Sequence, residues 1–399
     1  MSRSGLLTGT SILLWSLLGS AQTMQIRLSN ELGIARQAET VSLPWRDLLQ
    51  RLPRLSADHV WIVDSEGGVR DIQIVDADQD GHPEELLFQA DLGGWQTVTY
   101  LLSVRPEPRP VPVSRAYGRY VPERLDDFAW ESDRIAFRAY GQALMTDPQE
   151  KLTSSGIDVW VKRVSYLVVD KWYASGAYHQ DHGEGLDCYS VGKSRGCGGG
   201  GVWRGGVLYS SENWLTHRIL ANGPIRVSFE LTYASWDAAG QRVSERKRVT
   251  LDAGSNLNRV ESIFVSEDGR EIPVAVGIAD HNNKGATFQD LQQGVLAFWE
   301  ATPNAQNGTI GCGVVMPHGA REVLDAAGHH LVTALAESGR PLTYYAGAGW
   351  DRSGQFGSLL DWQTYLTQFA QRLRSPLQVT LPEPLPPSPP HIQADRPNN

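Results

Sequence analysis

The chain has 399 residues, of which 41% are hydrophobic and 20% are charged, and its formal net charge is −9. A chain of this length can bury one large hydrophobic core or two. The negative charge and the lack of a basic block argue against nucleic acid as a partner, because phosphates are neutralised by clustered Lys and Arg. No long apolar stretch follows the N-terminal segment, so we expect no membrane span.

Residues 1–21 have the pattern of a secretory signal peptide. Arg3 stands near the start, an apolar run follows at residues 12–18, and the small residues Gly19 and Ala21 fit a cleavage site. The run is too short to cross a bilayer, and a buried N-terminal helix is the alternative. No Cys follows the run, so we expect a mature protein without a lipid anchor, in the periplasm or secreted.

Residues 25–104 carry a first group of predicted strands. The runs at 26–28, 60–64, 72–75, 85–90 and 98–104 are rich in β-branched and aromatic residues. The Pro-rich segment 105–112 then marks either a module boundary or one connection within a single sandwich. We favour a single β-sandwich over residues 22–381, with 25–104 as an alternative N-terminal sub-module. Residues 382–399 are predicted to be a disordered, Pro-rich tail.

An acidic turn follows the third of these strands. Asp76, Asp78 and Asp80 alternate along the chain, and Gly81 allows a sharp turn after them. Three carboxylates at this spacing can face one hard cation, as in calcium loops. A plain acidic hairpin turn is the alternative reading. If the turn binds a metal, we expect structural calcium. We expect no cofactor that the activity requires.

The second half of the chain is predicted to be an antiparallel sheet with one helix. Apolar and polar residues alternate from 225 to 233, and short Gly/Asp/Asn turns separate further strands at 241–251, 258–265 and 272–278. Strands are also predicted at 295–300, 310–317, 331–337 and 342–345. Residues 358–374 have apolar positions at helical spacing, and Pro376 ends that helix.

The densest group of chemically active residues lies between 178 and 201, in a Gly-rich stretch with loop composition. Loops carry sites because a scaffold positions them and solvent reaches them. Cys188 and Cys197 are predicted to close this stretch with a disulfide in an oxidising compartment, which leaves Cys312 as a buried thiol. A metal site is a further reading of this stretch, because four of its residues are possible ligands: His179, Asp181, His182 and Glu184. Their spacing matches no standard zinc signature. A mobile acidic loop tied by the disulfide is the alternative to a site.

Three other stretches supply further candidate residues. Arg124 lies in a charged and aromatic segment, 119–134, where an ion-pair network is the alternative to a substrate-binding rim. His281 and Lys284 follow a predicted strand, and Trp350 follows another among small residues that would leave its ring exposed. Ordinary packing is the alternative explanation for each of these residues.

Together these segments resemble a family of secreted bacterial proteins catalogued as a domain of unknown function and encoded near polysaccharide-degrading enzymes. The resemblance covers almost the whole mature chain. It rests on residues 76–88, 119–130, 136–141, 179–192, 307–311 and 345–350. Ser132 stands where the family pattern has Asn. The resemblance implies a mainly β fold, an antiparallel β-supersandwich of the galactose-mutarotase type with a C-terminal helix, and an oligosaccharide substrate.

The resemblance also implies dehydratase activity on uronic-acid ends of oligosaccharides from ulvan-like polysaccharides. Removal of water across C4–C5 needs a group that neutralises the substrate carboxylate, a base and an acid. Arg124 and Arg195 suit the first role, with Lys284 and Trp350 as further substrate contacts. The candidates for proton transfer are His179, His182, Tyr189, Lys193 and His281. A polysaccharide lyase, a mutarotase and a non-catalytic sugar-binding protein are the alternatives.

Overall fold

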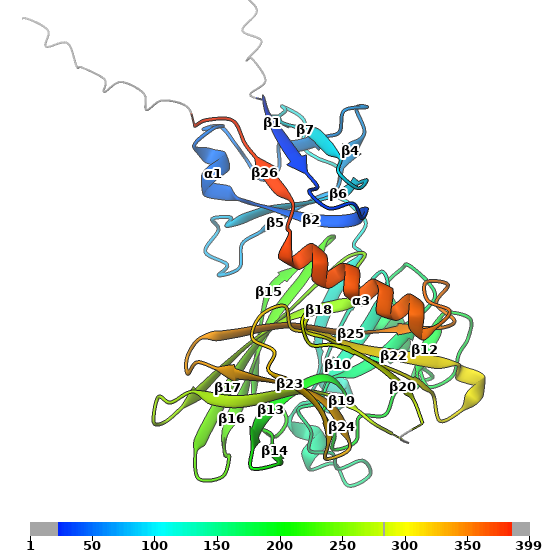
Figure 1. Cartoon of the computed structure of the whole chain (residues 1–399). Coiled ribbons are helices and arrows are strands. Elements are labelled where there is room, and N and C mark those ends of the chain that lie inside the picture. The colour runs from blue at the N-terminus through cyan, green and yellow to red at the C-terminus, as the bar shows by residue number, and fades with distance from the viewer. Residues whose placement is uncertain (1–22, 282–283, 385–399) are drawn as a thin grey trace, which may run out of the picture.

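The computed structural model describes residues 23–281 and 284–384, which form two β-sheet modules stacked end to end (Figure 1). The predicted signal peptide, and residues 385–399 of the predicted tail, lie outside the described residues. The smaller module contains the N-terminal strands, and the larger module contains the rest of the chain up to its C-terminal helix. The mainly β, antiparallel fold predicted from the sequence is confirmed.

The small module is a sandwich of two sheets with its own hydrophobic core. One sheet has the order β26 (Gln378–Thr380), β1 (Thr23–Ser29), β7 (Thr97–Val104), β3 (Val60–Val63) and β4 (Val69–Arg70). The other has the order β2 (Arg36–Pro44), β6 (Glu85–Leu92) and β5 (Ile72–Val75), and the short helix α1 (Trp45–Leu49) follows β2. The alternation in β1 turns Met24, Ile26 and Leu28 into this core.

The C-terminal strand β26 belongs to the small module although it follows the large one in sequence. It pairs with β1, with Arg27 opposite Thr380 and Ser29 opposite Gln378. The chain therefore crosses between the modules twice, once through the linker after β7 and once after the C-terminal helix. The strands expected at 25–104 thus form sheets of their own, completed by a strand from the other end of the chain.

The large module is a sandwich whose first layer is one broad sheet. Its eight strands pair in an antiparallel order from one edge to the other: β15 (Thr216–Asn222), β16 (Arg226–Asp237), β17 (Arg242–Asp252), β18 (Leu257–Ser266), β25 (Pro341–Trp350), β22 (Thr309–Val315), β21 (Val295–Ala301) and β20 (Ala286–Asp290). The strands predicted between 225 and 345 lie here, except for two, β19 and β24, that belong to the opposite layer.

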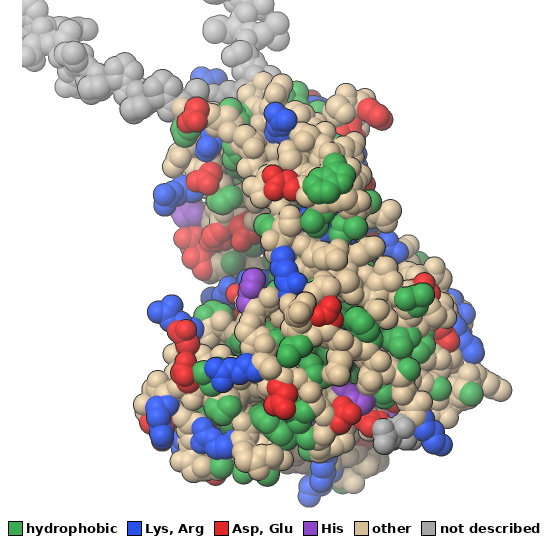
Figure 2. Space-filling model, in the orientation of Figure 1, with side chains coloured by type: hydrophobic (Ala, Val, Ile, Leu, Met, Phe, Trp, Pro, Cys, Tyr) green, Lys and Arg blue, Asp and Glu red, His purple; other side chains and the backbone are tan. Residues whose placement is uncertain are grey.

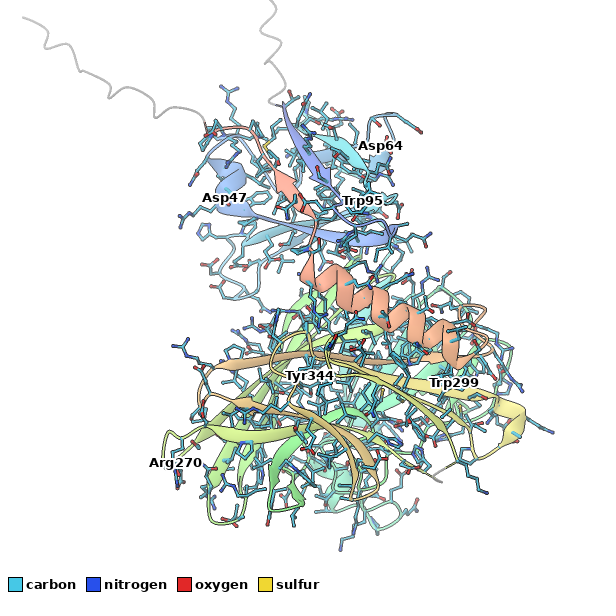
Figure 3. All side chains as sticks on the ribbon, viewed as in Figure 1. Asp47, Asp64, Trp95, Arg270, Trp299 and Tyr344 are labelled. Atoms are coloured by element: carbon cyan, nitrogen blue, oxygen red, sulfur yellow. The ribbon has the colours of Figure 1, made fainter. Side chains whose placement is uncertain are left out.

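Two five-stranded sheets make up the opposite layer. One has the order β12 (Gly185–Asp187), β11 (Asp158–Lys162), β10 (Ile135–Ala139), β9 (Asp127–Ser132) and β8 (Ala116–Val121). The other has the order β14 (Val207–Tyr209), β13 (Cys197–Arg204), β19 (Ile272–Ala279), β24 (His329–Ala336) and β23 (Glu322–Ala326). Aromatic side chains fill the space between the layers, and Tyr344 is fully buried there (Figure 3).

Helices cover the outer faces of the large module. The predicted C-terminal helix is confirmed as α3 (Leu359–Arg374), which begins at the N-cap Ser358 and packs Trp362 and Leu366 against the broad sheet. Trp299 lies at the same contact (Figure 3). A second helix, α2 (Val169–Ser175), covers the outer face of the β8–β12 sheet. Short 3₁₀ helices occupy Pro122–Arg124, Gln142–Met145 and Ala305–Asn307.

Among the described helices, none is both long and apolar enough to cross a membrane.

Candidate functional site

The outer face of the β8–β12 sheet carries buried charges where an apolar surface would be expected. Along each strand, alternate residues point away from the sandwich core. The outward positions on β9 to β12 hold an unusual set of side chains under α2 and the loop after it: Asp127, Glu131, Arg138, Asp158, Trp160, Lys162 and Asp187. Buried charges of this kind need partners, so their contacts determine what this face can do.

Three of these carboxylates surround one guanidinium, and we call Asp127, Arg138, Asp158 and Asp187 the Arg138 cluster. Arg138 donates to Asp158 Oδ2 from Nε at 2.9 Å and from Nη2 at 2.6 Å. Its Nη2 also lies 3.0 Å from Asp187 Oδ2, and its Nη1 lies 3.6 Å from Asp127 Oδ2. The cluster therefore holds three acids against one base.

This imbalance keeps protons in the cluster. Burial raises the pKa of Asp127 to about 6, although Arg138 opposes the shift. The pKa of Asp187 is also raised, first by burial and then by the charge of Asp158. Within the described residues, Asp127 Oδ1 has no hydrogen-bond partner. Perturbed carboxyl groups with unused hydrogen-bonding capacity are typical of functional sites.

Aromatic rings enclose the cluster. Trp160 and Tyr178 stack with their centroids 4.8 Å apart, and the Arg138 guanidinium lies 5.3 Å from the Trp160 ring. The Tyr173 hydroxyl donates to Asp127 Oδ2 at 3.1 Å. These rings exclude water from the charges, which strengthens every electrostatic interaction inside the cluster.

His179 is the point at which this cluster meets solvent. Its side chain is 63% exposed, and its Nδ1 lies 3.5 Å from Asp187 Oδ2 and 3.3 Å from the backbone oxygen of the same residue. Both neighbours are acceptors, so Nδ1 carries the proton and Nε2 is left as the basic nitrogen on the solvent side. The ring packs on Tyr178 with a centroid distance of 4.6 Å. A carboxylate behind an exposed imidazole is the arrangement of a general base.

Arg124 lies beside the same tyrosine. Its Nε donates to the Tyr178 hydroxyl at 3.1 Å, and its Nη2 donates to both carboxylate oxygens of Glu150 at 2.7 and 2.6 Å. Burial alone would lower the pKa of Arg124, but Glu150 and Tyr178 raise it, so the guanidinium stays charged. The Glu150 side chain is 49% exposed. The sequence candidates His179 and Arg124 thus meet around Tyr178.

His281 and Tyr189 form a second group. Their rings meet edge to face at 5.1 Å, and both line a small pocket with Cys188 and Glu300. His281 Nδ1 is hydrogen-bonded to Glu300 and its Nε2 to the backbone oxygen of Ser190. Burial alone would lower its pKa, but the bond to Glu300 raises it. Both ring nitrogens are therefore occupied, and His281 holds the loop rather than offering a free base.

The remaining sequence candidates divide into exposed and buried residues. His182, Lys193 and Lys284 are exposed, and none of them is among the main electrostatic partners of Asp127, Arg138 or Asp187. Arg195 is buried, where its Nη1 donates to Ser155 Oγ at 2.7 Å, and burial lowers its pKa to about 10. A buried guanidinium of this kind cannot reach a substrate in solution.

The expected exposure of Trp350 is wrong. The ring is 1% exposed, its Nε1 donates to the Asn307 backbone oxygen at 2.7 Å, and the Arg163 guanidinium lies over it at 4.7 Å. The small residues before Trp350 leave room for Trp362 and Phe356 instead. Close packing of α3 on the sheet, and not ligand access, explains the glycines at this position.

The expected disulfide between Cys188 and Cys197 is not formed, and all three described cysteines are free. The physical reason is the direction of β13, which buries Cys197 between the layers with its thiol 3.1 Å from the Gly347 backbone oxygen. Cys312 is buried beside Cys197, and this neighbour adds to the effect of burial in raising the pKa of the Cys312 thiol. Cys188 lies instead at the small pocket, where burial raises its pKa to about 12.

The acidic turn has the shape that its sequence predicted. Asp76, Asp78, Asp80 and Glu84 each offer a carboxylate oxygen, and these oxygens lie within 4.8 Å of one another. The Glu84 carboxylate also accepts a bond from the Ala77 backbone N–H at 2.6 Å. Figure 2 shows acidic side chains gathered on the small module, close to the junction with the large one. The four oxygens fit a hard cation such as calcium.

Sequence reasoning missed most of the Arg138 cluster. Asp127, Arg138 and Asp158 were not singled out, and Asp187 was only one acid among several in a loop. A usable signal was present in Asp158-Val-Trp-Val-Lys162, where both charged residues share the outward side of a strand with Trp160. Tyr178 was also missed, because Tyr189 lies in the same stretch and has the same chemistry.

With this geometry in place, comparison with known proteins gives the family. The model of the family described as "Domain of unknown function (DUF4861)" matches residues 28–379, and the chain belongs to this family. The chain is 34% identical over 380 residues to "Uncharacterized protein P7" of Formosa agariphila, covering 89% of this chain and 93% of that protein.

Solved structures are similar at a lower level. An α-mannosidase from Enterococcus faecalis V583 has a TM-score of 0.44 at 10% identity, covering 91% of this chain and 46% of that one. A protein in the glycosyl hydrolase family 38 from Enterococcus faecalis has a TM-score of 0.46 at 11% identity, covering 91% and 48%. The chain thus spans about half the length of these solved chains.

Proposed function

We propose that this protein is an exported carbohydrate-active enzyme that removes water across C4–C5 of a terminal uronic acid in an oligosaccharide. The observation that carries the proposal is the exposed imidazole of His179, held against buried Asp187 and next to Arg124 and Tyr178. These are the groups that β-elimination next to a carboxylate requires. The family resemblance in the sequence supports this choice of substrate class, and ulvan-type oligosaccharides are the first to test.

In this proposal His179 is the base. Its Nε2 takes the C5 proton of the uronic acid, and the side-chain and backbone oxygens of Asp187 that face Nδ1 orient the imidazolium that results. The electron pair of the broken C5–H bond forms the C4–C5 double bond, and the C4 hydroxyl departs as water after it receives a proton. Asp187 is a positioning residue, because it acts through the imidazole.

Arg124 and Tyr178 supply the other two functions. The Arg124 guanidinium receives the substrate carboxylate in place of Glu150, which makes the C5 proton more acidic. Tyr178 accepts its hydrogen bond from Arg124 and keeps its own proton for the leaving hydroxyl. The Tyr178 and His179 rings pack together with their centroids 4.6 Å apart, so in this proposal acid and base reach the sugar from the same side.

The test is direct. The purified mature protein is mixed with uronic-acid-ended oligosaccharides while ultraviolet absorbance of the conjugated double bond and the product mass are followed. New absorbance with loss of one water from an intact oligomer supports the dehydratase. New absorbance with shorter fragments indicates a polysaccharide lyase, and a ligand that binds without any product indicates a sugar-binding protein.

A further inference from the structure

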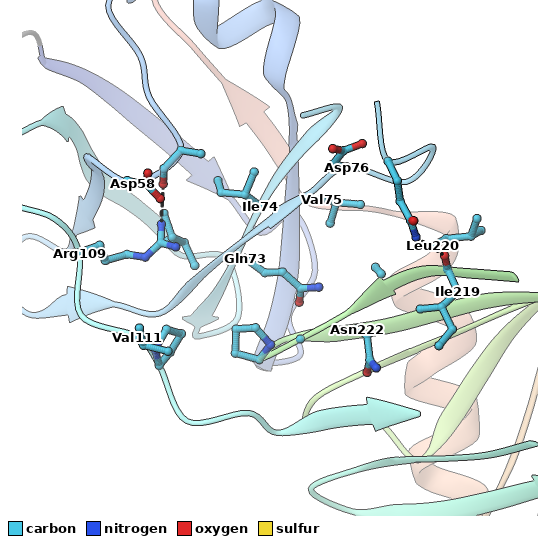
Figure 4. Close-up of a pocket in the computed structure, with 17 residues that line it drawn as sticks. Asp58, Gln73, Ile74, Val75, Asp76, Arg109, Val111, Ile219, Leu220 and Asn222 are labelled. Carbon is cyan, nitrogen blue, oxygen red and sulfur yellow. Dashed lines mark hydrogen bonds between the residues drawn. The ribbon is translucent and has the colours of Figure 1, made fainter. Parts of the chain in front are cut away.

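A second cleft lies at the junction of the two modules, away from the β8–β12 face (Figure 4). Its volume is about 520 Å³, which is within the range of small-molecule sites and large enough for one or two sugar rings. One wall comes from β5 of the small module, another from the linker at 109–112, and the third from the end of β15 and the turn after it, residues 219–224. Ala57 and Asp58 complete the lining, so four segments of the chain build the cleft.

Arg109 is the residue in this cleft with unused bonding capacity. Its Nη1 makes a 3.4 Å bond to the Ala57 backbone oxygen, while its Nε is buried and has no hydrogen-bond partner within the described residues. Burial lowers the pKa of Arg109, and the nearby carboxylate of Asp58 opposes the shift. This Nε is closed off from solvent, so a ligand in the cleft meets the outer nitrogens of the guanidinium, of which Nη1 has only the long bond to Ala57.

The other polar side chains show what kind of ligand suits the cleft. Gln73 and Asn222 are already engaged with backbone groups, and they shape the walls rather than bind. Asp58 and Asp76 line the cleft with Arg109, so its formal charge is −1. An anionic ligand is therefore disfavoured, whereas a neutral ligand with both donors and acceptors can use Arg109 and Asp58 together.

Apolar groups complete the cleft. Val111 is 93% exposed on the linker, and Ile74 and Ile219 line the opposite walls. An exposed apolar rim beside a guanidinium and a carboxylate suits the apolar face and the hydroxyl edge of a pyranose ring. We propose that this cleft is a second, non-catalytic site that binds an uncharged sugar residue of a polysaccharide chain.

The choice of a sugar over other neutral polar ligands rests on the proposed function of the β8–β12 face. The linker that carries Arg109 and Val111 runs directly into β8, the edge strand of that sheet. A glycan held in the cleft by a neutral residue is thereby kept on the same molecule as the site that takes the charged end. Linking two weak sites in this way raises the overall affinity for a long chain.

The experiment measures affinity by calorimetry in the full mature chain, with oligosaccharides that contain both neutral and uronic-acid residues as the probe. Asp58→Ala and Arg109→Ala test the cleft, and His179→Gln tests the other site. Glu66→Ala is the matched control, because Glu66 is an exposed carboxylate of the same module outside the cleft. Asp58 is exposed, so its variant is expected to fold, whereas Arg109→Ala could loosen the linker.

We expect Asp58→Ala and Arg109→Ala to weaken binding of long oligosaccharides roughly tenfold each, as for loss of a hydrogen bond to a charged group. Glu66→Ala should leave the affinity unchanged, and turnover of short uronic-acid-ended substrates should be unaffected in all three variants. Unchanged affinity in both cleft variants, or no binding by the wild-type protein, would overturn the cleft proposal. The dehydratase proposal is judged separately, by product formation from the short substrates.

Discussion

The outer face of the β8–β12 sheet holds two buried charge groups that differ in their degree of closure. Lys162 and Glu131 are both fully buried and form an ion pair of 2.6 Å. Glu131 also accepts the backbone N–H groups of Val168 and Val169, and Lys162 donates to the Ser132 backbone oxygen. Every charge of this pair is used within the protein.

The Arg138 cluster, on the same strands, is not closed in this way. Its three acids exceed its one base, one carboxylate oxygen has no partner within the described residues, and His179 connects it to solvent. The difference shows how a structural ion pair can be told apart from a candidate functional site on the same face of a sheet. A balanced, fully bonded pair fixes the start of α2, whereas an unbalanced one keeps protons and bonding capacity for a ligand.

Breaking the closed pair should give the largest effect. Lys162→Met leaves the Glu131 charge buried without its cation, so the free energy of unfolding should fall by about 3–5 kcal/mol. Urea denaturation measures this change. Lys171→Met is the matched control, because Lys171 is 62% exposed in its pair with Glu184 and should cost less than about 1 kcal/mol. Equal costs for the two variants would show that the Glu131–Lys162 pair is not closed as described.

Replacing His179, the residue of this site that faces solvent, should lower activity without changing stability. His179→Gln removes the basic nitrogen, and we expect kcat to fall at least about a hundredfold, as for loss of a general base. The free energy of unfolding should stay within about 0.5 kcal/mol of wild type, since the side chain is exposed. His182→Gln, three residues along the loop, should retain full activity. If both variants kept full turnover, this loop would have no part in the chemistry.

The proton held by Asp127 should appear in the pH dependence of stability. The pKa of Asp127 is about 6 in the folded protein, against 3.8 for an ordinary Asp, which we take for the unfolded chain. Between about pH 4 and pH 6 the folded chain therefore binds a proton that the unfolded chain has lost. The protonated Asp127 therefore contributes on the order of 3 kcal/mol to the free energy of unfolding below about pH 4, and this contribution is lost as the pH rises through about 6. Asp127→Asn should remove this slope in urea denaturation across that window, while Asp71→Asn, an exposed carboxylate, should not. Parallel curves for Asp127→Asn and wild type would contradict the assignment.

The smallest expected effect comes from the acidic turn. If it binds calcium, millimolar calcium should raise the unfolding free energy of the small module by about 1–3 kcal/mol, as expected for a ligand well above its Kd. Asp80→Asn should abolish the shift and Glu66→Gln should preserve it. A thermal unfolding curve that does not respond to calcium would leave the turn as a plain acidic hairpin.

Much of the fold could be predicted from local patterns. Alternation and short turns identified β16 to β19 nearly to their ends, and the apolar spacing at 358–374 gave α3 with the correct boundaries. Strands β8 to β13 were not identified, because strands buried on both faces, such as β9 and β10, lose the alternation that marks a half-exposed strand. The pairing of β26 with β1 was beyond reach, since nothing local in three residues specifies a partner 350 positions away.

The site divides in the same way. His179 and Arg124 could be found because reactive residues stood out in charged, loop-like stretches. Asp127, Arg138 and Asp158 lie inside strands, and only register brings them together: Arg138 pairs directly with Asp158, and Trp160 with Asp187. Arg195 and Trp350 were misplaced for the opposite reason, because a glycine-rich sequence looks like an open loop even where glycines serve close packing between layers.

The return of β26 to β1 has a consequence for the order in which the protein can assemble. A chain leaving the ribosome exposes β1 and its partners early, yet the edge of that sheet stays open until residue 380 has been made. An open strand edge invites pairing with other chains. The small module is thus completed last although it is encoded first, and a chain cut short before Gln378 would carry its unfinished edge throughout its lifetime.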